Sequence, residues 1–189
     1  AGSGNEWTSF QRDGNGMVTW MAEGDSDNNP TNGVGPSTLF FYDTTNPGKV
    51  TEVRRRSSIR YEGTFVCDGT PTGNAGCKRS RYNWNATTGL LDSKTEDGWT
   101  YNSSNAVTSF SYTTGYTYDS VGRMTLIAGP LPSVEDNTEF TFYSSTDVFK
   151  NGYPDEVRRR KDASNYLITK FDEYDYFGNA KSEKAPDTT

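Results

Sequence analysis

The strongest constraint on this chain is a duplicated pattern of strand, turn and strand. One copy covers residues 41–56 and the other covers residues 142–160. Each copy has a Phe-Tyr pair, then a turn rich in Gly, Pro and Asn, then the same five residues, Glu52–Arg56 and Glu156–Arg160. A five-residue match in matching context is improbable by chance, so the chain is built from repeats. Such units bury their apolar faces against their neighbours.

A shorter unit recurs around these copies, and its clearest example covers residues 116–130. Tyr116 and Tyr118 alternate as in a strand, and Asp119 to Gly122 supply a turn, because Asp bonds turn backbone and Gly adopts a positive φ. A strand resumes at Arg123, so the unit is a β-hairpin. We assign the repeat motif to Tyr42, Asp43, Gly48, Tyr82, Gly89, Tyr118, Asp119, Gly122, Arg123, Tyr143, Tyr174, Asp175 and Gly178.

The composition favours a sheet with one wet face. Hydrophobic residues make up 31% of the 189 residues, and aromatic residues alone make up 14%. Aromatic side chains favour strands, and a lone hairpin is marginal in water, so the hairpins must pair side by side.

The sequence therefore predicts an all-β fold of repeated antiparallel β-hairpins in a curved or spiralling sheet, without substantial helix. A single repeat region, 1–189, holds about six irregular hairpin units. Their approximate bounds are 7–25, 38–60, 80–98, 112–130, 139–162 and 166–186.

Several functions are excluded or disfavoured. The chain has no histidine, which removes Ser-His-Asp catalysis and His-containing zinc sites. The net charge of −6 argues against nucleic-acid binding, and no apolar run approaches the roughly 18 residues of a membrane helix. Spacing singles out no carboxylate pair. We therefore expect no enzymatic activity, no catalytic residue and no cofactor.

The only two cysteines, Cys67 and Cys77, bracket a loop rich in turn residues, whose ends can meet easily. We predict a disulfide between them and hence an oxidising, extracellular location. The alternative is two unrelated thiols.

The two arginine runs are the feature of the sequence that most clearly indicates a binding function. Arg54, Arg56, Arg158 and Arg160 form a candidate binding set for anions or acidic glycans. The alternative, which a motif inherited with the repeat favours, is that the arginines pair with acids on a neighbouring hairpin. Likewise, the four tryptophans are either a platform for stacking sugars or the core that the scarce aliphatics do not supply.

Residues 25–29 begin like a calcium loop, with Asp25, Asp27 and Asn29 at alternating positions. The later Gly and Glu of an EF-hand are missing, so an acidic turn is the favoured interpretation and the metal site is a weak candidate. Asn85 and Asn102 head triplets of the N-glycosylation pattern.

The hairpin unit resembles the RHS/YD-repeat family, named after a Tyr-Asp pair followed closely by Gly-Arg, as in Tyr118-Asp119 and Gly122-Arg123. Tyr174-Asp175 with Gly178, and Tyr42-Asp43 with Gly48, look like further copies, and residues 82–90 are similar to a Tyr-Asn variant. The resemblance implies a β-sheet shell of the kind found in bacterial toxins and cell-surface adhesion proteins. The family's aspartyl self-cleaving segment has no match here.

The leading hypothesis is a non-catalytic structural segment, a scaffold or shell of toxin type, in a secreted or cell-surface protein. The first alternative is an extracellular module that binds glycans or a cell-surface receptor. The second is a subunit of an extracellular fibre that assembles through its edge strands. The expected partners are neighbouring repeats of a larger parent chain or copies of the chain itself.

Overall fold

The computed structural model describes residues 8–23, 37–56, 77–131, 136–144, 150–162 and 164–188. These residues form twelve strands and no α-helix. The strands are β1 (Thr8–Arg12), β2 (Val18–Glu23), β3 (Ser37–Tyr42), β4 (Val50–Arg56), β5 (Cys77–Trp84), β6 (Leu91–Tyr101), β7 (Val107–Tyr118), β8 (Met124–Ala128), β9 (Thr138–Phe142), β10 (Pro154–Arg160), β11 (Tyr166–Tyr174) and β12 (Ala180–Thr188).

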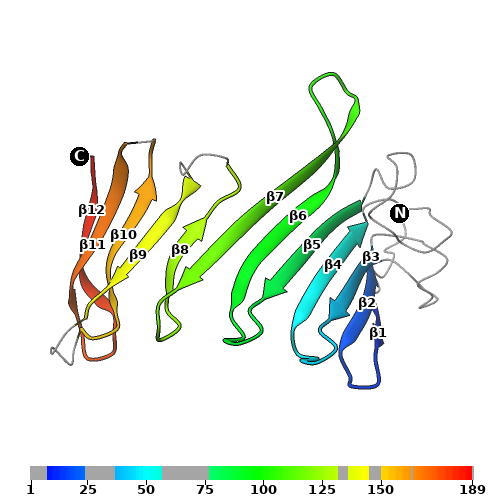
Figure 1. Cartoon of the computed structure of the whole chain (residues 1–189), viewed down its shortest axis with the longest axis horizontal. Helices are drawn as coiled ribbons and strands as arrows, with labels where there is room; N and C mark the ends of the chain where they lie inside the picture. The colour runs from blue at the N-terminus through cyan, green and yellow to red at the C-terminus, as the bar shows by residue number, and fades with distance from the viewer. Residues whose placement is uncertain are drawn as a thin grey trace, which may run out of the picture. The chain divides into compact units, whose positions relative to one another are not determined.

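The strand order in the sheet is the order of the strands in the chain, β1 to β12 (Figure 1). The pairings with a defined register are antiparallel, as between β3 and β4 or β10 and β11. The predicted all-β fold of antiparallel hairpins is confirmed. The predicted curvature of the sheet stays a prediction.

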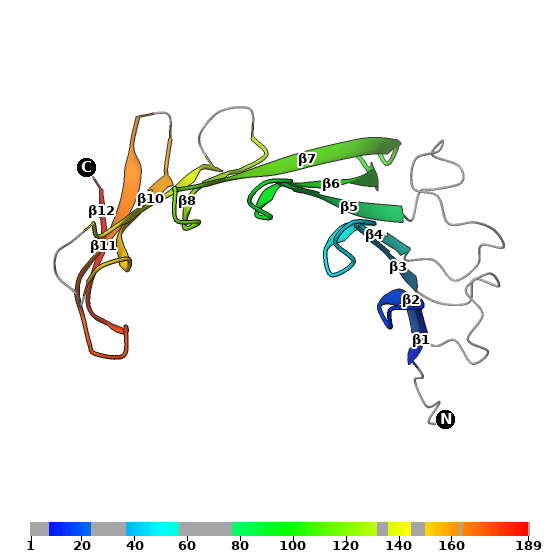
Figure 2. The ribbon, with the colours of Figure 1, turned by 60° about the horizontal axis from the view of Figure 1, so that its bottom comes forward.

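The chain divides into two compact units. Unit 1 comprises Ala1–Trp84 with Lys94–Tyr112, and unit 2 comprises Asn85–Ser93 with Thr113–Thr189. In unit 1, β1 to β5 follow one another side by side as a single layer (Figures 1 and 2). A single layer encloses little volume, so few side chains are buried.

The apolar core of the described residues is correspondingly small. Trp20 and Val53 are buried in unit 1. Trp20 lies opposite Leu39 on β3, and Val53 lies opposite Phe40 on β3 and Ser80 on β5. The core interpretation of the tryptophans therefore holds for Trp20.

Strand pairing shifts by a residue where several hairpins approach their turns. In β7 and β8, Thr117 pairs with Leu126, but the next residue, Tyr118, pairs with Met124. The same shift occurs at Arg12 in β1 and at Tyr42 in β3. Such a bulge leaves an extra residue in one strand and re-aims the side chains beside it. In β3 and β7 it falls at the aromatic position of the repeat motif, and in β1 Arg12 stands at that position.

Candidate functional site

The repeat motif builds a compact turn, which is best defined at Asp119. The Asp119 amide donates to the carbonyl of Arg123 at 2.9 Å, and the Gly122 amide donates back to the Asp119 carbonyl at 3.1 Å. The Asp119 side chain then accepts the amides of Val121 and Arg123 at Oδ1, at 3.0 and 2.9 Å. Gly122 has a φ of 87°, a conformation that side chains disfavour. Asp closes the turn, and Gly allows its backbone path.

The arginine of the motif completes this turn. The Nε of Arg123 donates to Asp119 Oδ2 at 2.6 Å, so one carboxylate holds two backbone amides and one guanidinium. The same guanidinium lies 4.6 Å from the ring centroid of Phe142, the last residue of β9. Arg123 therefore joins its own turn to the following hairpin.

The same turn occurs at three other places among the described residues. At each, an Asp or Asn accepts the amides two and four residues later at Oδ1, and a residue with positive φ stands three residues after it. The three turns begin at Asp13, Asn102 and Asp175, with Gly16, Asn105 and Gly178 at the positive φ. Asn102 and Asn105 thus build this turn without Asp or Gly.

A looser version begins at Asp43, Asn85 and Asp162, whose Oδ1 atoms accept the amides two and three residues later. Gly89 takes a positive φ of 72° in one of them. Gly48 does not, although the sequence places it where the motif has its glycine. The longer connection between β3 and β4 removes that requirement.

These bonds lower the pKa of several turn carboxyl groups. The side-chain and backbone hydrogen bonds from Asn179 hold the pKa of Asp175 below its ordinary value, and the amides of Asn46 and Thr45 do the same for the pKa of Asp43. Desolvation raises the pKa of Asp119, but the bonds from Arg123 and Val121 outweigh it, and the net pKa is lowered. The turns at Asp43, Asp119 and Asp175 are thus held by ionised carboxylates at neutral pH.

In four hairpins, an aromatic residue directly before the turn ties the hairpin to the preceding one. The Tyr118 hydroxyl, at the end of β7, donates to the carbonyl of Leu91, at the start of β6, at 3.0 Å. Tyr42 bonds Val18 in the same way at 2.7 Å, and Tyr174 bonds Pro154 at 2.6 Å. In each case the last residue of one strand donates to the first residue of the strand before it. Burial raises the pKa of Tyr118 and Tyr174, so both hydroxyls stay protonated donors.

The third hairpin uses a tryptophan in this role. Trp84 ends β5, and its indole Nε1 donates to the carbonyl of Val50 at 2.8 Å. Trp84 and Asn85 therefore occupy the Tyr-Asp place, and Tyr82 lies two residues too early, inside the strand. An indole N–H is a donor like a phenol hydroxyl, which is why the substitution works.

Tyr143 departs from this pattern. It follows β9, and its hydroxyl donates forward to the carbonyl of Phe171 on β11 at 2.7 Å. The β9–β10 hairpin is instead joined to the preceding β7–β8 hairpin by the cation–π contact between Arg123 and Phe142. The two halves of the duplicated pattern thus differ in their aromatic contacts.

One arginine of each run pairs with an acid of its own strand. Arg54 forms an ion pair with Glu52, and Arg158 forms one with Glu156. Lys170, directly across on β11, adds a second cation 3.5 Å from Glu156. Burial raises the pKa of Glu156, but Arg158 and Lys170 outweigh it and lower the net pKa. Pairing of the arginine runs with acids of a neighbouring hairpin, the alternative that the sequence favours, stays a prediction.

The other arginines of the candidate anion set, Arg56 and Arg160, belong to different units. Arg160 stands 4.3 Å from the ring centroid of Tyr166, and Arg54 also lies 4.5 Å from the ring centroid of Phe41. Arg56 is the last residue of β4. Arg54 and Arg56 belong to unit 1, and Arg158 and Arg160 to unit 2.

The sequence alone did not identify Asp97, on β6, as the acidic partner of two arginines on β5. This buried carboxylate binds Arg79 Nε at 2.7 Å and Arg81 Nη2 at 2.5 Å. Lys78 and Lys94 both pair with the neighbouring Glu96, at 3.0 and 3.3 Å. Charged residues of β5 and β6 thereby crosslink adjacent strands.

Several predictions fall outside the described residues. Cys67 and the candidate calcium ligands Asp25, Asp27 and Asn29 lie there, and so does Trp7. The disulfide with Cys77 stays a prediction. In the part of the chain that the structure describes, no cluster of three acidic or thiol side chains is arranged to hold a metal. No helix of that part has the length and apolarity to cross a membrane.

Comparison with known proteins gives little. No protein-family model matches the chain, and no curated protein matches it. A solved structure described as the crystal structure of TcdB2-TccC3-Cdc42 contains a similar chain, with 13% sequence identity and a TM-score of 0.33. The match covers 94% of this chain and 10% of that one, so this chain spans about a tenth of its length. At this level of similarity we take neither fold nor function from it.

Proposed function

We propose that the chain is a non-catalytic scaffold, a run of YD-type β-hairpins that forms a structural segment of a toxin-type protein at the cell surface or in the extracellular space. The observation that supports this proposal most strongly is the repeated joint between hairpins. An Asp or Asn side chain closes the turn of a hairpin. The aromatic residue directly before that turn donates its N–H or O–H to the first residue of the preceding strand, and so attaches the hairpin to the one before it.

The same observation favours architecture over catalysis. The carboxylates of Asp119 and Asp175 accept backbone amides, and their pKa values are lowered. A carboxylate held in this way is a poor proton donor at neutral pH, because a general acid needs a pKa near the working pH. The residues that carry the resemblance to the family are thus engaged in holding the turns together.

The strand order supports the choice of partner. Of the strands that the structure describes, β1 in unit 1 and β12 in unit 2 each have a single neighbour in that order. Edge strands present backbone N–H and C=O groups that can pair with another strand. We propose that further hairpins of a parent chain pair there, and the alternative is another copy of this chain.

Electron cryomicroscopy of the protein encoded by the complete reading frame tests this proposal. The expected result is a sheet in which hairpins continue beyond β1 and β12. Filaments formed by edge pairing between identical chains would favour the fibre alternative instead. A strand segment that rearranges around a bound substrate, together with catalytic conversion of that substrate, would contradict the scaffold role.

A further inference from the structure

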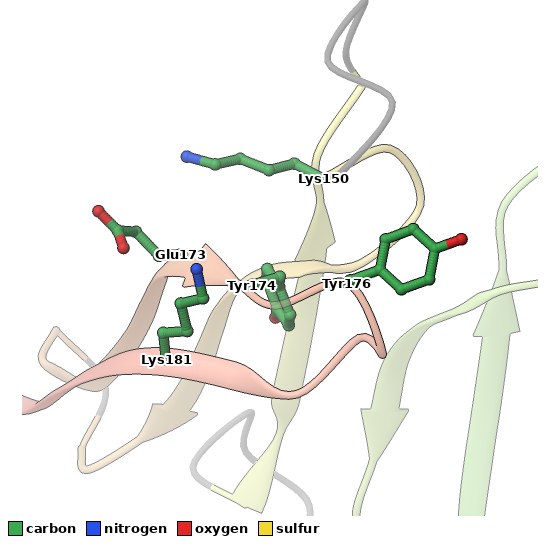
Figure 3. A pocket seen from close by; sticks show the side chains of 5 residues that line it. All are labelled: Lys150, Glu173, Tyr174, Tyr176 and Lys181. Atoms are coloured by element: carbon green, nitrogen blue, oxygen red, sulfur yellow. The ribbon is translucent and has the colours of Figure 1, made fainter.

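A hollow in unit 2 is lined by charged and aromatic side chains, only some of which take part in the hydrogen bonds between hairpins. It has a volume of about 390 Å³ and is lined by Lys150, Glu173, Tyr174, Tyr176 and Lys181. Lys150 precedes β10, Glu173 and Tyr174 end β11, Tyr176 lies in the following turn, and Lys181 lies on β12. The charged ends of Lys150, Glu173 and Lys181 lie on one side of the hollow, and the Tyr176 ring extends from the other (Figure 3).

Lys150 is held in place. Its Nζ donates to the carbonyl of Asp172 at 2.7 Å and lies 5.3 Å from the ring centroid of Tyr143. The Tyr143 hydroxyl in turn bonds the carbonyl of Phe171, on the same strand as Asp172. An ammonium has three donors, so Lys150 keeps hydrogens for a ligand after making this bond.

The other two charges of the hollow have no ion-pair partner among the described residues. Lys181 and Glu173 are exposed and form no ion pair within 4.0 Å there, although the charge of Lys181 helps to lower the pKa of Asp175. Charges nearby on the same two strands do pair: Lys184 with Asp172 at 2.6 Å, and Lys170 with Glu156 at 3.5 Å. The hollow therefore offers two cations and one carboxylate to a ligand.

The two tyrosines of the hollow differ in how they are held: Tyr174 is fixed by its contacts, and Tyr176 is exposed to solvent. The Tyr174 ring stacks on Tyr153, with centroids 4.7 Å apart and an interplanar angle of 17°, and its hydroxyl is fixed to Pro154. Tyr176 is 84% exposed and meets Phe177, 83% exposed, edge to face at 5.7 Å. Large exposed aromatic side chains mark binding surfaces more often than scattered aliphatic ones do.

We propose that this hollow binds an acidic sugar, a saccharide residue that carries a carboxylate. Lys150 and Lys181 bind the carboxylate through charge-assisted hydrogen bonds. Glu173 accepts hydrogen bonds from sugar hydroxyls, and the tyrosine rings cover the apolar face of the sugar ring. Glu173 disfavours a phosphate, because the negative charges repel, whereas a monoanion rich in hydroxyls suits all three charges. This binding role is additional to the proposed scaffold and does not depend on it.

Nuclear magnetic resonance titration of the intact chain with glucuronate tests the proposal, with glucose, acetate and inorganic phosphate as comparison ligands. We expect glucuronate to bind with resonance shifts at Tyr176 and Lys181, and glucose and acetate to bind about tenfold or more weakly, the loss expected when one strong hydrogen-bonded contact is removed. Failure of glucuronate to bind, or equal binding of acetate, would overturn the acidic-sugar assignment. Tighter binding of phosphate would overturn it too.

Matched variants locate the site. Lys181→Met removes an exposed lysine without an ion pair, so we expect an intact fold and glucuronate binding weakened about tenfold. Lys161→Met removes the same charge from an exposed position between β10 and β11, outside the hollow, and should leave binding unchanged. Glu173→Gln should narrow the preference for glucuronate over acetate. Equal losses in Lys161→Met and Lys181→Met would overturn the site, as would binding of anionic lipid vesicles in place of glucuronate.

Discussion

The hydroxyl of Tyr118 donates a hydrogen bond of 3.0 Å to the carbonyl of Leu91, 27 residues earlier in the chain. Tyr118 ends β7 and Leu91 begins β6, so the bond joins one hairpin to the preceding one at the end of the strands where the turns lie. Asp119, the next residue, closes the turn of its own hairpin. Two adjacent residues thus perform the two tasks of a repeat, closing one hairpin and attaching it to its neighbour.

Tyr118→Phe should destabilise the chain by about 1 kcal/mol, the usual net contribution of one hydrogen bond. The ring remains, so packing changes little, and the Leu91 carbonyl loses its hydroxyl donor. Urea unfolding followed by circular dichroism measures the effect. Tyr112→Phe, at a side chain that is 55% exposed, is the control and should change the midpoint little.

Gly122→Ala should cost about 1–2 kcal/mol, the penalty for placing a side chain in the left-handed region. An added Cβ would meet no atom closer than Leu90 Cδ1 at 3.9 Å, so the backbone conformation alone causes the loss. Gly14→Ala is the matched control within a turn, because Gly14 has neither a left-handed φ nor an atom within 4 Å of the new Cβ. Equal unfolding midpoints for the two variants would refute the role of φ at Gly122.

Gly178→Ala should be more destabilising than Gly122→Ala. Gly178 has a similar φ of 82°, but its Cβ would lie 2.5 Å from the Tyr153 hydroxyl oxygen and 2.9 Å from two ring carbons. Tyr153 stacks on Tyr174, so it can yield only by disturbing that pair. Thermal unfolding of both variants side by side checks the ranking, and a smaller loss for Gly178→Ala would contradict the close approach.

Asn105→Gly should stabilise the chain, by up to about 1 kcal/mol, because Asn105 holds a φ of 59° without being glycine. The larger backbone entropy of glycine in the unfolded chain offsets part of the gain. Asn105→Ala should destabilise, since alanine lacks the tolerance of asparagine for this conformation. Denaturant midpoints of the two variants should therefore move in opposite directions from wild type.

Acid should weaken the turns. The hydrogen bonds from Asn179 lower the folded pKa of Asp175 relative to its ordinary value of 3.8. A lowered folded pKa contributes stability that is present above 3.8 and is lost as the pH falls through the folded value. Urea midpoints measured from pH 7 to pH 2 should fall steeply in this acidic window. In Asp175→Asn, which keeps the acceptor oxygen, the fall should be smaller, and an unchanged slope would contradict this assignment.

The local parts of this account were predictable from sequence, and the parts that depend on packing were not. The turn from Asp119 to Gly122 lies within a few residues, so its Asp and Gly identify it. The turn at Asn102 escaped prediction because Asn105 replaces the glycine, and Trp84 escaped because an indole replaces the phenol.

The hydrogen bonds between hairpins were also hard to predict because their spacing in the sequence varies. The four aromatic donors reach back 20 to 34 residues, so they give no fixed period in the sequence. The hollow combines Lys150 with Lys181, which only the packing of β9–β10 against β11–β12 brings together. No local pattern marks such a site.

Amide hydrogen exchange of Tyr118→Phe compared with wild type tests most directly whether these bonds couple successive hairpins. The turn of the preceding hairpin is reported by the Asn85 amide, which bonds the Leu90 carbonyl at 2.8 Å, and by the Gly89 amide, which bonds the Asn85 carbonyl at 2.9 Å. The account predicts faster exchange at both amides as well as at Gly122, and no change at Gly16. Faster exchange confined to residues 119–123, with Asn85 and Gly89 as protected as in wild type, would contradict it.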